Sequence, residues 1–270
     1  MINLGTVTIR SFLSYLLYHD VCPEYKFNIG EATKSCDLAT KELWQNQQLT
    51  AKGPGNFNTA CTTIFGGLEH DIYVEENKWV NPKDDTVHMD KRVAQKVLRL
   101  ALAVAGTNQL VALFHKKANA GTLKATKLDD IHGFEVTVVR FLDEEERKFY
   151  EDQAPDLYPV GILFGRAYYD PGQPDYDLSP EEREEWTKDG RPAQDLLFFV
   201  EESLLEHCYP GMKIIATVWE LNCGFHYFED IIKAYCSIYT PLVNELMIGW
   251  KKPRDLTIKD DDESDANDSE

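Results

Sequence analysis

Apolar residues recur at helical spacing through the first half of the chain. Near its start they mark one face of a first helix, at Ile9, Phe12, Leu13, Leu16 and Leu17. A second helix is expected to open at Pro23, a position where the missing amide hydrogen costs nothing. Its apolar stripe alternates steps of four and three residues and comprises Tyr25, Ile29, Ala32, Cys36, Ala39 and Leu43. Such a stripe is expected to pack against neighbouring helices.

Glycine and proline divide the rest of this half. Gly53-Pro54-Gly55 should break the chain before a short helix over residues 56–65, which Gly66-Gly67 would end. Residues 69–87 are polar and irregular. A strongly amphipathic helix is then expected from Asp90 to a stop at Gly106. Its predicted inward residues are Val93, Val97, Leu100, Ala101 and Val104.

The second half changes period. Alternating apolar residues predict half-buried strands around residues 134–138 and 160–164, and residues 213–221 resemble another strand. Ser179-Pro-Glu-Glu182 is a capping box that predicts a short acidic helix, and residues 230–246 are expected to form a long one. The sequence therefore predicts an α+β fold, with a helical N-terminal half packed with a mixed strand and helix C-terminal half. Residues 1–254 are expected to form a single composite globular domain.

The charge is strongly negative but uneven. The chain of 270 residues carries a net charge of −18, and residues 255–270 hold eight acidic residues and one lysine without any periodicity. This segment is expected to be a disordered acidic tail. The remaining 254 residues still carry −11, which counts against nucleic acid as the main partner. No apolar stretch reaches the ~18 residues that cross a bilayer, so no membrane partner is expected.

Chemical motifs are scarce. The glycines at 53–55 lack the lysine and hydroxyl of a phosphate-binding loop, and no Gly-x-Ser-x-Gly nucleophile turn is present. Neighbouring acidic residues such as Glu201 and Glu202 are expected by chance among 46, so solvated surface is their expected place. The sequence therefore favours a protein that is not an enzyme and needs no cofactor.

One alternative uses cysteine and histidine. Six cysteines are scattered along the chain and should be reduced thiols. Two Cys–His pairs with three-residue spacing could make a tetrahedral zinc site if the fold joined them, and this would leave room for an unrecognised zinc-dependent enzyme. The four residues are His19, Cys22, Cys223 and His226.

Residues 91–127 reverse the overall charge. They contain eight basic residues and no Asp or Glu: Lys91, Arg92, Lys96, Arg99, Lys116, Lys117, Lys124 and Lys127. The last four are expected in or near an exposed loop. The segment is either a solvated face paired with acidic neighbours or a docking patch for an acidic protein surface or an RNA backbone. Because aromatic residues are not interleaved as in single-strand binders, direct RNA binding is kept as an alternative.

Several segments together resemble the first Argonaute-binding subunit family of the fungal Argonaute siRNA chaperone complex. They span roughly residues 11–254 and include Tyr18-His-Asp-Val-Cys-Pro-Glu-Tyr25, Gly53-Pro-Gly-Asn-Phe-Asn-Thr-Ala-Cys61, Phe65-Gly-Gly67, Asp170-Pro-Gly-Gln-Pro-Asp-Tyr-Asp177, Val218-Trp-Glu-Leu-Asn-Cys-Gly224 and Asn244-Glu-Leu-Met-Ile-Gly-Trp250. None of these is a chemical signature, and it is their order and joint occurrence that carry the resemblance.

The resemblance implies a subunit without catalytic residues that binds Argonaute together with a second chaperone subunit. Such a protein would regulate siRNA duplex maturation and RNA-directed heterochromatin silencing, and it would contact siRNA through Argonaute. The expected compartment is the nucleus, with the cytoplasm as a second one. Family members tend to carry more sequence before the first helix than this chain does.

Overall fold

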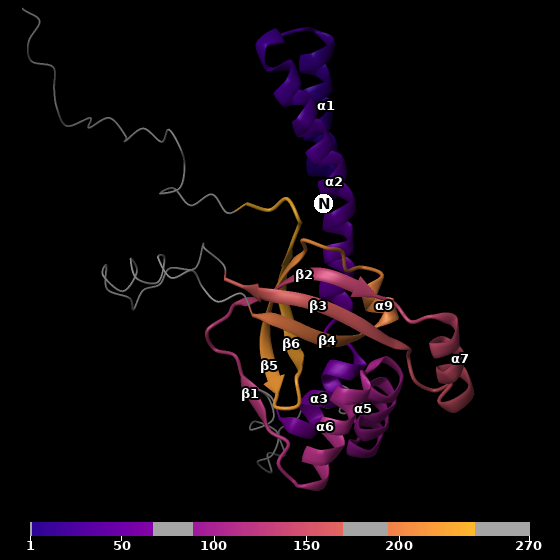
Figure 1. Ribbon diagram of the computed structural model, residues 1–270. Helices are drawn as coiled ribbons and strands as arrows, with labels where there is room; N and C mark the ends of the chain where they lie inside the picture. The colour runs from indigo at the N-terminus through magenta and orange to yellow at the C-terminus, as the bar shows by residue number, and fades with distance from the viewer. Residues whose placement is uncertain (1, 67–88, 170–193, 241–270) are drawn as a thin grey trace, which may run out of the picture.

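The computed structural model describes residues 2–66, 89–169 and 194–240 (Figure 1). The predicted α+β class is confirmed, because helices dominate the first half and strands the second. The helices are α1 Ile2–Tyr18, α2 Lys26–Lys52 after a 3₁₀ turn at Pro23–Tyr25, α3 Asn56–Phe65, α5 Lys91–Ala105, α6 Asn108–Asn119, α7 Glu144–Gln153 and α9 Glu202–Leu205. The strands are β1 Ala125–Lys127, β2 Gly133–Arg140, β3 Val160–Tyr168, β4 Asp195–Glu201, β5 Lys213–Leu221 and β6 Phe225–Tyr235.

Five of the described strands form a closed sheet. The order along the sheet is β1-β5-β2-β3-β4-β6, and β6 pairs with β5 as well as with β4. All pairings in the described sheet are antiparallel except β4 with β6, which meet in parallel at Phe198 and His226. Closure leaves β1 as an added strand on the outer edge of β5.

Two apolar clusters hold this sheet. The first is rich in aromatic rings of the strands, with Phe134 against Phe198 at 4.3 Å between ring centroids and Phe228 at 5.5 Å from both. The second lies between the sheet and helices α3, α5 and α6, where Phe57 meets Phe199 at 5.3 Å. The helices therefore cover one side of the sheet, as Figure 1 shows.

We call the sheet and the helices packed against it the body. Helix α2 connects the body to a projecting hairpin, which consists of α1 and the N-terminal part of α2. Its last turns are fixed to β6 by buried polar groups, because Asn46 donates to the Ala234 carbonyl at 3.2 Å and Glu42 accepts from the Ser237 amide at 2.9 Å. The N-terminal part of α2 extends away from the sheet and packs against α1 (Figure 1). The apolar stripe of α2 was predicted to pack against neighbouring helices, and among the described helices α1 packs most extensively against α2. Tyr25 of the stripe is 57% exposed.

Two sequence predictions need correction. Residues 230–235 continue strand β6, so the long helix predicted from residue 230 is wrong as far as residue 240, where the described part ends. The predicted core face of α5 is confirmed at Val97 and Ala101, which are buried, but it is wrong at Val93, which is 43% exposed. The core face also includes Ala94, Leu98 and Leu102, which are buried. The expected capping box at Ser179, the irregular stretch 69–87 and the acidic tail all lie outside the described residues.

Candidate protein-interaction surface

Helix α5 presents a basic face to solvent. It follows Asp90 and ends before Gly106, as its sequence predicts. Its apolar residues at positions 94, 98, 101 and 105 are buried against the core, so the residues between them point outward. Arg92, Lys96 and Arg99 follow steps of four and three residues and are exposed, which confirms the predicted outer face.

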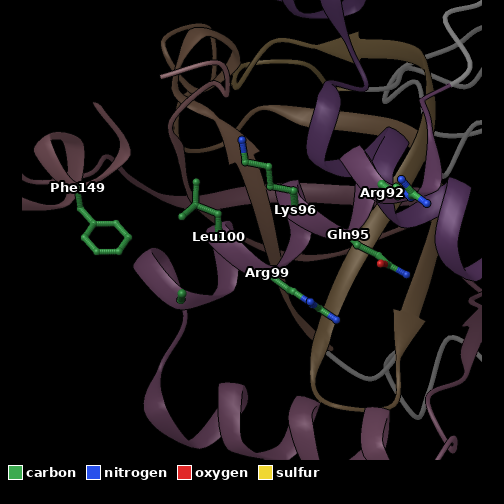
Figure 2. Close-up of a pocket in the computed structure, with 7 residues that line it drawn as sticks. Arg92, Gln95, Lys96, Arg99, Leu100 and Phe149 are labelled. Atoms are coloured by element: carbon green, nitrogen blue, oxygen red, sulfur yellow. The ribbon is translucent and has the colours of Figure 1, made fainter. Parts of the chain in front are cut away.

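A groove lies beside this face, between α5 and α7. Its volume is about 410 Å³, and its lining combines three cations with apolar and amide groups. Figure 2 shows Phe149 of α7 on one side, Leu100 at the centre, and the basic side chains on α5. The lining residues are Arg92, Gln95, Lys96, Arg99, Leu100, Ala103 and Phe149. We call this feature the α5–α7 groove.

The cations of the groove differ in how far they are neutralised. Lys96 donates to both carboxylate oxygens of Asp156, at 2.8 and 2.9 Å, and this contact lowers the pKa of Asp156. Within the described residues, Arg92 and Arg99 have no ion pair. Among the described residues, nothing therefore neutralises these two arginines, and a guanidinium is suited to bind a carboxylate with two hydrogen bonds.

The other predicted basic residues come from different elements. Lys116 and Lys117 occupy the last turn of α6, so the expectation of a loop is wrong for them. The ammonium of Lys117 donates to the carbonyl oxygen of Asn222. Lys124 precedes β1, and Lys127 within β1 pairs with Asp129 at 2.7 Å. The eight basic residues are thus spread over α5, α6, β1 and the loop before β1.

The proposed zinc ligands do not converge. His19 and Cys22 lie at the tip of the α1–α2 hairpin, whereas Cys223 and His226 lie at the turn between β5 and β6, at the opposite end of the body in Figure 1. In the described parts of the chain, no three His, Cys, Asp or Glu side chains are arranged to hold a metal ion. The four-residue zinc site is therefore wrong, because the fold separates its two halves.

His226 and Cys223 have structural surroundings instead. The Nδ1 atom of His226 accepts a hydrogen bond from the Leu197 amide at 3.2 Å, beside the Phe198 ring. Burial lowers the pKa of His226 to about 4, and burial raises the pKa of the Cys223 thiol to about 11. Both groups are therefore neutral near pH 7 and contribute to packing between strands.

A buried carboxylate was missed at the sequence level. Glu201 is only 3% exposed, although neighbouring acidic residues were expected at the surface. Its carboxylate accepts the Phe57 amide at the start of α3, and it lies against Gly55. Gly55 has a φ of +91°, and a Cβ at this position would collide with a carboxylate oxygen of Glu201. The Gly53-Pro54-Gly55 segment is therefore a joint that fits α3 onto β4.

Glu202 has a different role from its neighbour. Its carboxylate accepts bonds from the Arg147 guanidinium at 3.0 Å and from the Leu142 amide at 2.9 Å. These bonds tie α7 to the end of β4 and so fix one wall of the α5–α7 groove.

None of the helices that the structure describes is both long and apolar enough to cross a bilayer.

Comparison with known protein families identifies the family of the chain. The family model of the Argonaute siRNA chaperone (ARC) complex subunit Arb1 matches residues 1–253 of the chain. The comparisons with curated proteins and with solved structures found no match.

Proposed function

The chain belongs to the family of the Argonaute siRNA chaperone complex subunit Arb1, and from this premise we propose that it binds Argonaute directly as a non-catalytic subunit. The observation that carries the proposal is the extent of the family match, which covers 253 of 270 residues. The match includes the hairpin, the joint at Gly55 and the α5–α7 groove.

The chemistry of the groove supports a protein partner. Leu100 and Phe149 offer an apolar surface beside two arginines that are not ion-paired within the described chain. An acidic loop that carries one apolar side chain would satisfy both parts of this lining. A phosphate backbone would use the arginines but leave the apolar part unused, which is why we place siRNA contact on Argonaute.

The non-catalytic role agrees with how the buried polar groups are used. Glu201 accepts a backbone amide, His226 accepts another, and Glu42 binds Ser237. Each of these groups therefore has a structural partner at the joint between elements, although Glu201 Oε2 and His226 Nε2 have no hydrogen-bond partner among the described residues. We further propose that the protein acts in the nucleus, with a second population in the cytoplasm, in siRNA duplex maturation and heterochromatin silencing with a second chaperone subunit.

A pull-down with purified Argonaute tests the surface. The variant suggested by the sequence changes Lys96, Arg99, Lys116 and Lys117 to Glu. The structure suggests the double variant Arg92→Glu, Arg99→Glu, which tests the groove more specifically. Loss of two charge-assisted contacts should weaken Argonaute binding by roughly 100-fold. The control is Arg166→Glu with Lys233→Glu, two exposed cations on β3 and β6 that lie outside the groove.

The outcomes distinguish three possibilities: Argonaute binding through the groove, Argonaute binding that does not use the basic residues, and direct contact with RNA. Loss of binding in the α5 double variant, with the sheet control unchanged, supports the groove. Undiminished binding of Argonaute and siRNA in both the double and the quadruple variant removes the basic residues from the proposal. Retained Argonaute binding with a loss of siRNA that depends steeply on salt would instead favour direct RNA contact.

A further inference from the structure

Helix α1 lies outside the body of the molecule. Figure 1 shows α1 and the N-terminal part of α2 as a hairpin that projects from the sheet. Among the described elements, α2 is the one against which α1 packs extensively. The body holds only the root of the hairpin, through Glu42, Asn46 and Leu49 at the other end of α2. No other described element packs extensively against the rest of the hairpin.

Only one side of α1 is used by α2. Arg10 pairs with Asp37 of α2 at 3.1 Å, and half-buried Leu13 and Leu17 follow it at steps of three and four residues. Ile9 and Phe12 lie one residue earlier, about 100° around the helix. They are 53% and 58% exposed, and Val7, Tyr15 and Tyr18 on other sides of α1 are more than half exposed as well. The regular spacing of the face that holds Ile9 and Phe12, and not exposure alone, therefore distinguishes it.

This second face forms a regular strip. Gly5, Ile9, Phe12 and Leu16 follow steps of four, three and four residues. We call them the outer strip. Leu16, the last member of the outer strip, is half-buried. A helix with two adjacent apolar strips is typical of one that packs against two neighbours.

The charge of the hairpin favours a protein as that neighbour. Arg10 is the one charged residue between Ile2 and Tyr18, and Asp37 neutralises it. Residues 5–52 carry five basic and five acidic residues, so the hairpin has no net charge. It therefore offers no field that would attract a phosphate backbone or an anionic membrane.

We propose that the outer strip is the contact between two copies of this chain, packed with antiparallel α1 helices as a four-helix bundle. The spacing of the strip reads the same in both directions. A two-fold axis between Ile9 and Phe12 therefore places Ile9 opposite Phe12 of the second copy and Gly5 opposite Leu16 of the second copy. The small Gly5 of each copy then packs against the large Leu16 of the other, as close packing requires. A Cβ at Gly5 would meet nothing within 4 Å of its own chain, so this position has room for the opposing leucine.

Size and charge are consistent with such a dimer. A helix of 17 residues is about 25 Å long, and two helices side by side are about 20 Å wide, which gives about 500 Å² in projection. The accessible area of a corrugated face is larger, and a stable interface takes on the order of 800 Å² per partner. An antiparallel arrangement also carries the two bodies to opposite ends of the bundle. Because the hairpin is neutral, the two copies meet there without repulsion between net charges.

The mass of the purified full chain in solution tests this proposal. Light scattering after gel filtration should give about twice 30.9 kDa over a concentration series. Phe12→Glu and Ile9→Glu would each place a charge in the interface and should raise the dimer dissociation constant by about 100-fold. Both side chains are more than half exposed in the single copy, so its circular dichroism should not change. Ser14→Glu, at an exposed position on the opposite side of α1, is the matched control and should remain dimeric.

A compensating pair tests the antiparallel pairing itself. Gly5→Leu should weaken the dimer because it meets Leu16 of the second copy. The double variant Gly5→Leu, Leu16→Ala should recover most of the affinity, and no recovery would contradict the pairing. A mass of 30.9 kDa at every concentration, or a dimer that tolerates Phe12→Glu, would overturn the proposal. A monomer whose Argonaute binding falls in Phe12→Glu would assign the strip to Argonaute, which leaves the proposed function standing and removes self-association.

Discussion

Among single residues, Glu201 joins the first half of the chain to the second. It accepts the Phe57 amide at the start of α3 from the end of β4. Glu201→Ala should lower the free energy of unfolding by about 1–3 kcal/mol, because a buried amide at a helix start loses a charged acceptor. Glu201→Gln keeps an acceptor oxygen and should cost less than about 1 kcal/mol. Urea unfolding of the two variants measures the difference, and equal losses would contradict the capping role.

The same carboxylate should make stability depend on pH. Burial raises the pKa of Glu201 above its ordinary value of 4.5, despite the backbone hydrogen bonds that lower it. The unfolded chain therefore releases this proton at lower pH than the folded chain, and stability falls as pH rises through that window. The free energy of unfolding of the wild type relative to Glu201→Gln should decline above about pH 4.5 and then level off. A difference that does not vary with pH would show that the pKa of Glu201 is the same in the folded and unfolded states, and would contradict the effect of burial.

Gly55 tests the close approach of α3 to β4. Its φ of +91° and its contact with the Glu201 carboxylate leave no space for a side chain. Gly55→Ala should cost about 1–3 kcal/mol. Gly30→Ala is the control, since a Cβ there meets nothing within 4 Å and a helical glycine replaced by alanine gains about 0.5–1 kcal/mol. Thermal unfolding of both variants is the measurement, and similar shifts in the two would contradict the close approach.

Single buried residues were also the hardest feature to predict from the sequence. A glycine-rich break before residue 56 was predictable, but its contact with a carboxylate about 145 residues later was not. Adjacent acidic residues are common in this chain, and no local pattern separates buried Glu201 from ion-paired Glu202. Long-range closure of the sheet decides which one is buried.

Among helices and strands, strong periodicity was reliable and weak periodicity was not. The bounds of α3 and α5 agree with capping and stop signals. Residues 230–235 form a strand because β5 supplies its hydrogen-bonding partner, and that partner cannot be seen in a local window. The core face of α5 was predicted correctly at Val97 and Ala101 but not at Val93, because the apolar residues of this helix cover a broad arc and Leu100 lies in the groove.

Phe149 allows the apolar part of the α5–α7 groove to be tested separately from its charges. Its side chain is 46% exposed, so Phe149→Ala should leave the fold intact and weaken Argonaute binding by about tenfold. Phe141→Ala is the matched control, because Phe141 is 42% exposed and lies outside the groove lining. Titration calorimetry with purified Argonaute compares the two. An equal effect of both substitutions would contradict a specific role for the groove.

In the molecule as a whole, the reactivity of the cysteine thiols should differ between the body and the hairpin, because the two parts bury their cysteines to different extents. Six cysteines are free, and the four in the body are buried: Cys61, Cys208, Cys223 and Cys236. Burial raises the pKa of Cys208 to about 12, and it raises the pKa of each of the other three as well. Iodoacetamide should therefore modify Cys22 and Cys36 of the hairpin first, as measured by peptide mass spectrometry. Early modification of the buried four in the native protein would contradict the packing of the body.

Net charge predicts the behaviour of the whole chain but not of its parts. The chain carries −18, yet the hairpin is neutral and α5 is basic on its outer face. The basic face was visible from the spacing of Arg92, Lys96 and Arg99. The groove beside it was not, because α7 comes from a segment about 50 residues further along the chain. The sequence therefore predicted the exposed cations of α5. It did not predict the apolar side chain of Phe149 on α7, which lines the groove beside them.

Whether this chain holds Argonaute can be measured in its native cells. The tagged full-length chain is purified by affinity at endogenous level, and the proteins recovered with it are quantified by mass spectrometry. We expect Argonaute to be enriched together with a second subunit, and Arg92→Glu with Arg99→Glu to reduce the amount of Argonaute recovered. Absence of Argonaute from the purified wild-type material would contradict the proposed function.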